Sequence, residues 1–105
     1  MHGMEEKLFR AFVLRIPGIA RATIVLIENE LHDRPYALLE DVFVERAYRG
    51  QGNGRKISQM AIDKAREMGC YKIVCTSRSE REHVHALYES LGMKKHGYSF
   101  RLDFD

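Results

Sequence analysis

RAYRGQGNGRKI, residues 46–57, joins two segments of different hydrophobic periodicity. Gly50, Gly52 and Gly54 stand at every second position in it, and basic residues flank them on both sides. The apolar run before the stretch has strand length, whereas apolar residues after it recur at helical spacing. The stretch therefore predicts a strand, a glycine-rich loop and a helix in direct succession.

A loop of this kind at the start of a helix predicts an anion site. The first helical N–H groups have no partner inside the helix, and the helix dipole adds partial positive charge there. The dinucleotide fingerprint does not fit, because Arg55 stands where its third glycine should be, and no Lys-Ser/Thr follows Gly54 as a P-loop requires. The spacing that fits is R-x-x-G-x-G from Arg49 to Gly54, which favours a phosphate or pyrophosphate ligand over the alternative of a ligand-free turn.

Upstream of the stretch, three apolar segments of strand length occupy residues 8–16, 20–28 and 36–44. The turn signal Pro17-Gly18 and the polar run of residues 28–35 separate them. Because connections this short favour antiparallel pairing, the first half predicts a three-stranded meander.

Downstream, Gly69 should end the first helix, whose apolar face is expected at Ile57, Met60, Ala61, Ala65 and Met68. A strand at residues 71–77 should then run parallel to residues 36–44 through a right-handed crossover. A second helix should end at Gly92, with an apolar stripe of Val84, Leu87, Tyr88 and Leu91. The alternating tail, residues 97–104, predicts a final antiparallel strand. The prediction is one α/β domain over residues 1–105, a mixed sheet in the order βββ-α-β-α-β.

Composition narrows the function classes. Seventeen Lys and Arg against fifteen Asp and Glu give a formal charge of +2, which does not indicate nucleic-acid binding. No apolar run is long enough to span a bilayer, and the N-terminal residues lack a signal region, so no membrane partner and a cytoplasmic location are expected. Cys70 and Cys75 are too few for a disulfide scaffold and are expected to be reduced thiols.

Three motifs together carry a resemblance to a known family. LLEDVFVERAYRGQGNGRKI, GCYKIVCTS and REHVHALYESLGM resemble the coenzyme A loop and its flanking elements in the GNAT N-acetyltransferase superfamily. The resemblance covers about residues 36–104, which would form the coenzyme-binding core. It implies acetyl-CoA as co-substrate. No metal is expected, because His83 and His85 are two residues apart on a predicted helix and would point different ways.

The resemblance also assigns residues to the coenzyme. The family's pantetheine arm lies beside a strand that diverges from its parallel neighbour, and backbone groups near Val42 would polarise the thioester carbonyl. The pyrophosphate would be wrapped by the glycine-rich loop. The implied cofactor-binding residues are Val42, Phe43, Val44, Arg49, Gly50, Gln51, Gly52, Asn53, Gly54, Arg55 and Tyr88.

Acetyl transfer needs a base to deprotonate the amine and an acid for the leaving thiolate. Glu40 is the expected base, because it interrupts an apolar strand where a carboxylate is desolvated; the alternative is an edge carboxylate paired with an arginine. Asp41 is the second candidate, because strand neighbours face opposite sides. Tyr88 matches the family's acid beside the coenzyme sulfur, although a core tyrosine is its other interpretation. Arg81 could contact the coenzyme or an acidic acceptor.

The chain also departs from the family. Asn53 stands where an apolar residue is usual, and only about eight residues precede the first predicted strand, so the usual N-terminal strand and helices are lacking. Three alternatives follow. The acceptor site would be open to a large acceptor such as a protein, a second subunit would complete it, or the chain would bind acyl-CoA with little activity. A homodimer is favoured, because a missing wall exposes apolar surface.

The expected function is transfer of an acetyl group from acetyl-CoA to a primary amine, by direct attack in a ternary complex. The local similarity favours small amines such as glucosamine phosphate. The alternatives are a protein amine acetyltransferase and a non-catalytic acyl-CoA-binding module.

Overall fold

The computed structural model describes residues 2–76 and 82–105 of the chain. These residues form two compact units, Met1–Cys75 and Thr76–Asp105, and each unit is described by itself. Residues 77–81 lie outside the described part, and with them Arg81 and the end of the strand predicted for residues 71–77.

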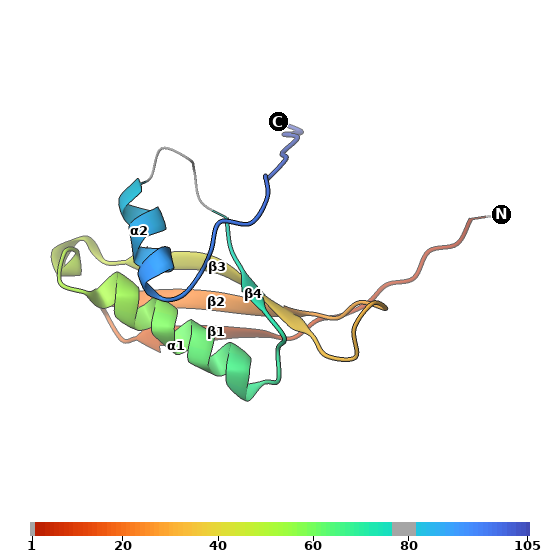
Figure 1. Ribbon diagram of the computed structural model, residues 1–105, viewed down its shortest axis with the longest axis horizontal. Helices are drawn as coiled ribbons and strands as arrows, with labels where there is room; N and C mark the ends of the chain where they lie inside the picture. Colours follow the sequence, from red (N-terminus) through yellow and green to blue (C-terminus); the bar gives the residue numbers. More distant parts are fainter. Residues whose placement is uncertain (1, 77–81) are drawn as a thin grey trace. The chain divides into compact units, whose positions relative to one another are not determined.

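The first unit contains a four-stranded mixed sheet in the order β1-β2-β3-β4 (Figure 1). Strands β1 (Ala11–Ile16), β2 (Ala20–Ile27) and β3 (Tyr36–Val44) are antiparallel neighbours, and β4 (Ile73–Val74) is parallel to β3. The predicted meander and parallel pair are therefore confirmed. The first strand starts later than predicted, and the fourth is much shorter.

The turn between β1 and β2 follows from its sequence. Pro17 presets the backbone, Gly18 has φ +74°, and the Ile19 N–H donates to the Ile16 carbonyl at 2.9 Å. Proline followed by a glycine with positive φ is the pattern of a type II turn.

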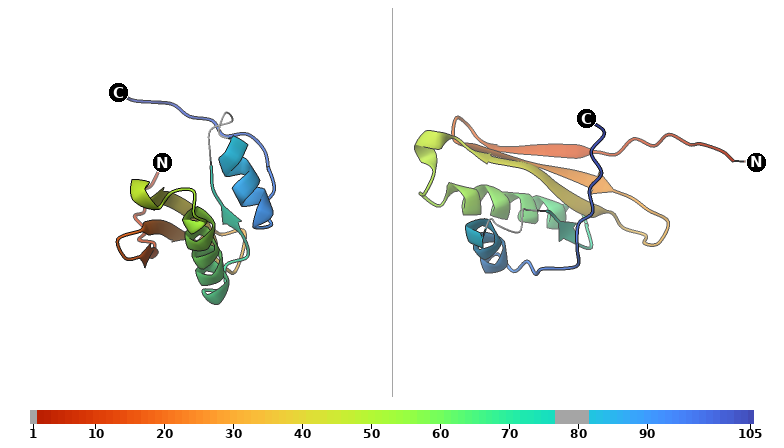
Figure 2. Two further views of the ribbon diagram at one scale, coloured as in Figure 1. Left: turned by 90° about the vertical axis from the view of Figure 1, so that its left-hand side faces the viewer. Right: turned by 90° about the horizontal axis from the view of Figure 1, so that it is seen from above.

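Helix α1 (Asn53–Glu67) lies along one face of β1, β2 and β3 (Figure 2). Strand β2 alternates fully buried and half-buried residues, as a strand does when a helix covers only one face of its sheet. The predicted helix is confirmed, but its core face includes Ile62, whereas Met60 and Met68 are only half-buried. The buried apolar residues of this core are Ala20, Ala22, Ile24, Leu26, Ala37, Leu39, Ile57, Ala61, Ile62 and Ala65.

Gly69 ends α1 as predicted, with φ +78°. The Cys70 N–H donates to the Ala65 carbonyl and the Gly69 N–H to the Arg66 carbonyl, both at 3.0 Å. These two bonds form the Schellman motif, which satisfies carbonyls at the helix end.

The second unit contains helix α2 (Glu82–Ser90), which ends by the same motif. Gly92 has φ +93°, and the Met93 N–H donates to the Tyr88 carbonyl at 3.0 Å. The half-buried side chains of α2 include the predicted stripe of Val84, Leu87 and Tyr88.

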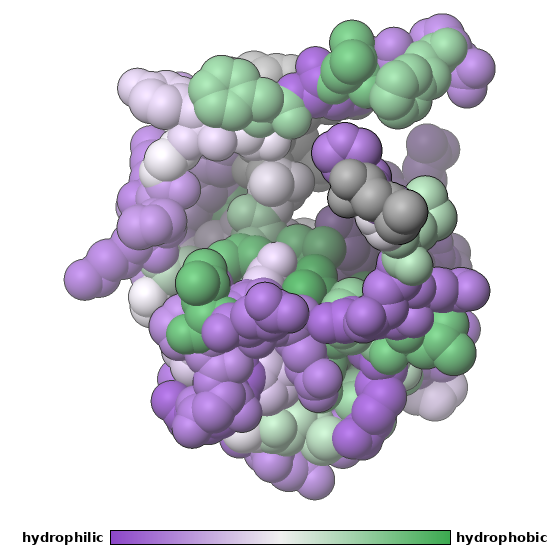
Figure 3. Space-filling model, turned by 90° about the vertical axis from the view of Figure 1, so that its right-hand side faces the viewer, coloured by the Kyte–Doolittle hydropathy of each residue, from purple (hydrophilic) through white to green (hydrophobic). Residues whose placement is uncertain are grey.

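The final strand predicted for residues 97–104 is not formed in the structure. Tyr98, Phe100, Leu102 and Phe104 are between 79% and 94% exposed. Alternation specifies the two faces of a strand, but a strand also needs a neighbour for its backbone hydrogen bonds, and none pairs with these residues in the described part of the chain. Other large apolar side chains are exposed as well, and the face in Figure 3 shows apolar residues among polar ones.

Candidate active site

Strand β3 has an open edge on the side of β4. The parallel pairing joins Ala37 to Ile73 and Leu38 to Val74, and β3 then continues to Val44. Among residues 2–76 and 82–105, no strand pairs with this edge beyond Leu38. Unpaired strand groups can accept an extended ligand as an added strand.

A β-bulge interrupts β3 in its middle. Thr23 of β2 is paired in register with Glu40, and Arg21 with Phe43, so β3 contains one extra residue between these pairs. Asp41 lies in the bulge with φ +54°, the only non-glycine residue in the described chain with positive φ. Because cross-strand partners share a face, Glu40 and Phe43 both project to the face of Arg21.

Asp41 forms an ion pair across the bulge. Its Oδ2 accepts from Arg21 Nε at 2.8 Å, and its Oδ1 from Arg21 Nη2 at 3.2 Å. The hydrogen bond with Arg21, together with the charges of Arg21 and Arg15, lowers the pKa of Asp41. The same bond raises the pKa of Arg21. Asp41 is therefore an ionised partner of an arginine, a poor choice for a proton acceptor.

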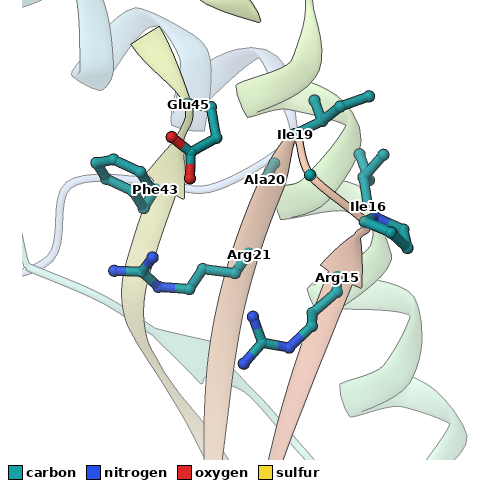
Figure 4. Close-up of a pocket in the computed structure, with 9 residues that line it drawn as sticks. Arg15, Ile16, Ile19, Ala20, Arg21, Phe43 and Glu45 are labelled. Carbon is teal, nitrogen blue, oxygen red and sulfur yellow. The ribbon is translucent and has the colours of Figure 1, made fainter.

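Arg21 also contacts the ring of Phe43, with its guanidinium carbon 4.6 Å from the ring centroid. Figure 4 shows Arg21 reaching from β2 toward Phe43, at an open pocket beside the β1–β2 turn. Arg15 extends on the same side of the strands. The pocket is lined by Arg15, Ile16, Ile19, Arg21, Phe43 and Glu45, among others.

Glu40 differs from its neighbour. Its side chain is exposed, so the desolvation expected from its place in an apolar strand is absent in the structure. Within the described residues no ion pair involves Glu40, and the arginine-paired carboxylate is Asp41 instead. Burial, followed by the negative charge of Glu40, raises the pKa of Cys75.

Side-chain bonds to the backbone shape the glycine-rich loop. A short 3₁₀ turn, Arg46–Tyr48, follows β3. Arg49 Nε donates to the Val44 carbonyl at 2.9 Å, and Gln51 Nε2 to the Ala47 carbonyl at 3.3 Å. Asn53 Nδ2 donates to the Tyr48 carbonyl at 2.9 Å, so the residue that departs from the family pattern fastens the loop to the turn.

Two of the three glycines are required by backbone conformation. Gly50 has φ +72° and Gly52, the N-cap of α1, has φ +84°. A Cβ at either position would meet no atom within 4 Å, so the requirement is conformational and not a matter of space. Gly54 lies inside the first turn of α1, where the N–H groups of a helix are unsatisfied.

The structure thus brings together the predicted residues from Glu40 to Arg55 within the first unit. Tyr88 is described within the second unit, where it is half-buried on α2. Arg21 is the residue that the sequence did not indicate. Its contact with Asp41 depends on the bulge, which no local pattern predicts.

Comparison with known proteins identifies the class to which this fold and loop belong. The model of the acetyltransferase (GNAT) family matches residues 9–93, and the chain belongs to this family. The resemblance found in the sequence is therefore confirmed.

Two curated relatives are named glucosamine 6-phosphate N-acetyltransferase. The one from Trypanosoma brucei brucei is 37% identical over 65 residues, covering 62% of this chain and 42% of the relative. The one from Arabidopsis thaliana is 31% identical over 67 residues, covering 64% and 43%. This chain matches less than half the length of either relative.

Solved structures agree. A putative acetyltransferase from Agrobacterium tumefaciens has a TM-score of 0.79 at 33% identity, covering 93% of this chain and 70% of that one. An acetyltransferase from Trypanosoma brucei has a TM-score of 0.75 at 29% identity, covering 82% and 59%.

Two features are absent from the part of the chain that the structure describes. None of the helices is long and apolar enough to cross a membrane. No group of three or more His, Cys, Asp or Glu in residues 2–76 and 82–105 is placed to hold a metal ion.

Proposed function

We propose that the chain binds acetyl-CoA along the open edge of β3 and transfers its acetyl group to a primary amine. The observation that supports this most directly is that, among the described residues, the pairing of β3 with β4 ends at Leu38 while β3 continues to Val44. The open edge runs directly into a loop with positive-φ glycines at the start of α1. An extended arm with amide groups suits the first feature, and a pyrophosphate suits the second.

The family resemblance implies the proposed coenzyme contacts, and this geometry is compatible with them. The backbone of Val42, Phe43 and Val44 would pair with the pantetheine amides. Residues 49–55 would hold the pyrophosphate, with N–H groups of the loop and of the first turn of α1 as donors. The Arg49 and Arg55 guanidinium groups add positive charge there. Arg49 is already oriented by its bond to the Val44 carbonyl.

For the chemistry, Glu40 is the proposed base. It accepts a proton from the acceptor's ammonium, directly or through a water molecule, and the neutral amine attacks the thioester carbon. Backbone groups near Val42 stabilise the oxyanion that forms. Tyr88 supplies the proton to the leaving thiolate, by its match to the family motif. Asp41 is set aside as a base because its carboxylate is held by Arg21.

The proposed acceptor is a small molecule that reacts in a ternary complex with acetyl-CoA. This proposal is supported by the two curated relatives, whose name, glucosamine 6-phosphate N-acetyltransferase, gives a small amine as the acceptor. Direct attack needs both substrates bound at once, and an exposed Glu40 is accessible to an amine that arrives after the coenzyme.

The first experiment is calorimetric titration of the chain with acetyl-CoA and, separately, with desulfo-CoA. Binding of both is expected, because the loop and strand contacts do not need the thioester. A Glu67→Gln variant, altered on the exposed surface of α1, serves as a matched control. A folded chain that binds neither ligand would overturn the proposal.

A second measurement separates the alternatives for the acceptor. Release of free thiol from acetyl-CoA is followed with glucosamine 6-phosphate, other small amines and lysine-containing peptides. Turnover with small amines supports the proposed class, and turnover with peptides alone would point to a protein acetyltransferase. Tight coenzyme binding without any turnover would identify a binding module.

A further inference from the structure

The bulge in β3 needs support beyond the strand ladder. Asp41 has φ +54°, a conformation that a residue with a side chain adopts unfavourably. Asp41 and Val42 have no register partner on β2, because the pairing resumes only at Phe43. The ladder alone therefore does not fix the backbone of Val42, the residue proposed to receive the thioester carbonyl.

Arg21 supplies the missing support on both sides of Val42. Its Nε and Nη2 donate to the two carboxylate oxygens of Asp41 at 2.8 and 3.2 Å, a two-point contact that fixes orientation as well as distance. The same guanidinium lies 4.6 Å from the ring centroid of Phe43. The planar guanidinium of Arg21 thus contacts both Asp41, before Val42, and Phe43, after it.

The surrounding charges favour this arrangement. Arg15 of β1 lies directly opposite Arg21, so two like charges face each other across the strands. Asp41 offsets both, because its carboxylate interacts with Arg21 and with Arg15, and the charge of Glu45 also acts on Arg21. Release of Asp41 would expose the arginine repulsion, so the pair and the bulge stabilise each other.

We propose that Arg21 is a positioning residue for acyl transfer. By holding Asp41 and Phe43, it fixes the Val42 backbone in the orientation that stabilises the oxyanion. The pair also keeps the Asp41 carboxylate away from proton transfer and leaves Glu40 as the carboxylate available on this strand. The inference rests on the proposed function and adds to it a residue that does not touch the reacting atoms.

The kinetic test compares Arg21→Gln, Arg21→Lys and the control Arg66→Gln, with glucosamine 6-phosphate as acceptor. Arg66 Nη1 lies 3.8 Å from Asp63 Oδ1 on the exposed side of α1. The Arg66→Gln substitution therefore removes an Arg–Asp pair that lies outside the proposed site. Arg21→Gln is expected to lower kcat by about 10- to 100-fold while the KM for acetyl-CoA changes by less than about twofold. Arg21→Lys, which keeps the charge without the fork, should fall between. An Arg21→Gln variant with the kcat of Arg66→Gln would overturn the proposal.

A second readout needs no acceptor. Amide hydrogen exchange at Phe43, the first residue paired with β2 after the bulge, should be about tenfold faster in Arg21→Gln, while the core amides of Ile24 and Leu39 keep their rates. If the wild-type chain transfers no acetyl group, the proposed function fails and the exchange still tests the role of Arg21. Unchanged exchange at Phe43 would overturn that role. If Arg21→Gln does not fold, the same comparison is made with Arg21→Lys.

Discussion

The two neighbouring carboxylates of β3, Glu40 and Asp41, differ in their surroundings. Asp41 is held by the Arg21 guanidinium, whereas Glu40 is exposed and lies on the face shared with Thr23. An ionised group in a two-point contact gives up its partner's hydrogen bonds if it takes a proton. Glu40 is therefore the carboxylate that we propose as the base, although the two residues are adjacent in the sequence.

The substitution Glu40→Gln tests the proposed role of Glu40 as the base, because glutamine keeps the size and shape of the side chain and removes the carboxylate. Loss of the base should lower kcat by about 100-fold or more at neutral pH, because the amine stays protonated. The affinity for acetyl-CoA, measured by calorimetry, should remain that of the wild type, since none of the proposed coenzyme contacts involves the Glu40 side chain. A kcat within a factor of about two of the wild type would show that another group accepts the proton.

The Arg21–Asp41 pair also predicts a pH dependence of stability. The pKa of Asp41 is lowered in the folded chain, so the pair stabilises the fold above the ordinary aspartate pKa and loses that contribution as the pH falls through the lowered value. Asp41→Asn should therefore differ from wild type most at neutral pH, and the difference should shrink below about pH 4. Urea unfolding across this range measures it. A difference that does not change with pH would contradict the prediction.

At the scale of elements, the sequence predicted best where two signals agreed. β3 was predicted at its observed bounds, because an apolar run was bounded by a polar turn on one side and the glycine loop on the other. The ends of α1 and α2 were also predicted, since Gly69 and Gly92 adopt the left-handed conformation that closes a helix. The strand predicted for residues 97–104 was wrong, because alternation of apolar and polar residues does not show whether a neighbouring strand is available for pairing.

Predictions for the candidate site also succeeded where the sequence pattern was unambiguous. The loop was predictable because glycines at alternate positions separate a strand pattern from a helical one, and in the structure Gly50 and Gly52 have positive φ. The bulge was not, because Asp41 occurs in regular strands and turns alike. The expectation that Glu40 and Asp41 face opposite sides assumed a regular strand, and the structure shows Asp41 bonded to Arg21 on the face of Glu40.

The glycine-rich loop gives an element-scale prediction with an internal control. Gly52→Ala should destabilise the chain by about 1–2 kcal/mol, because alanine resists the observed φ of +84°. Gly54→Ala, inside the helix and without positive φ, should be neutral or stabilising by about 1 kcal/mol. Thermal unfolding of both variants measures the contrast. Equal effects at the two positions would contradict a conformational role for Gly52.

Helix α1 also contains a polar residue without a partner. Ser58 is fully buried, and its hydroxyl has no hydrogen-bond partner among the described residues. Because an unsatisfied buried hydroxyl costs about 1–3 kcal/mol, Ser58→Ala should raise the free energy of unfolding by about 1 kcal/mol. Urea unfolding at neutral pH provides the measurement. A destabilised variant would show that the hydroxyl is hydrogen-bonded in solution.

At the scale of the whole molecule, the family assignment and the fold agree over most of the chain. The family model extends from residue 9 to residue 93, and the mixed sheet, the loop and α1 all fall within it. The two compact units each contain part of the predicted site, with Glu40 and the loop in one and Tyr88 in the other. That the chain is one domain over residues 1–105 stays a prediction.

We also expect the chain to be a homodimer. Several large apolar side chains are highly exposed, including Phe100 at 94% and Leu31 at 87%. Exposed apolar surface of this extent favours association. Light scattering coupled to size-exclusion chromatography should give twice the chain mass of 12.2 kDa at micromolar concentration. A single chain mass that persists as the concentration is raised would contradict the dimer.

The left-handed conformation of Asp41 has a consequence for directed evolution of this chain. Glycine and asparagine adopt that conformation more readily than aspartate. Under acid conditions, where the Arg21–Asp41 pair no longer contributes to stability, a selection for heat resistance would therefore favour Asp41→Gly, which relieves the backbone and loses the bond to Arg21. Variants selected in this way would be heat-resistant in acid and would transfer the acetyl group slowly at neutral pH, so a single residue links stability to turnover.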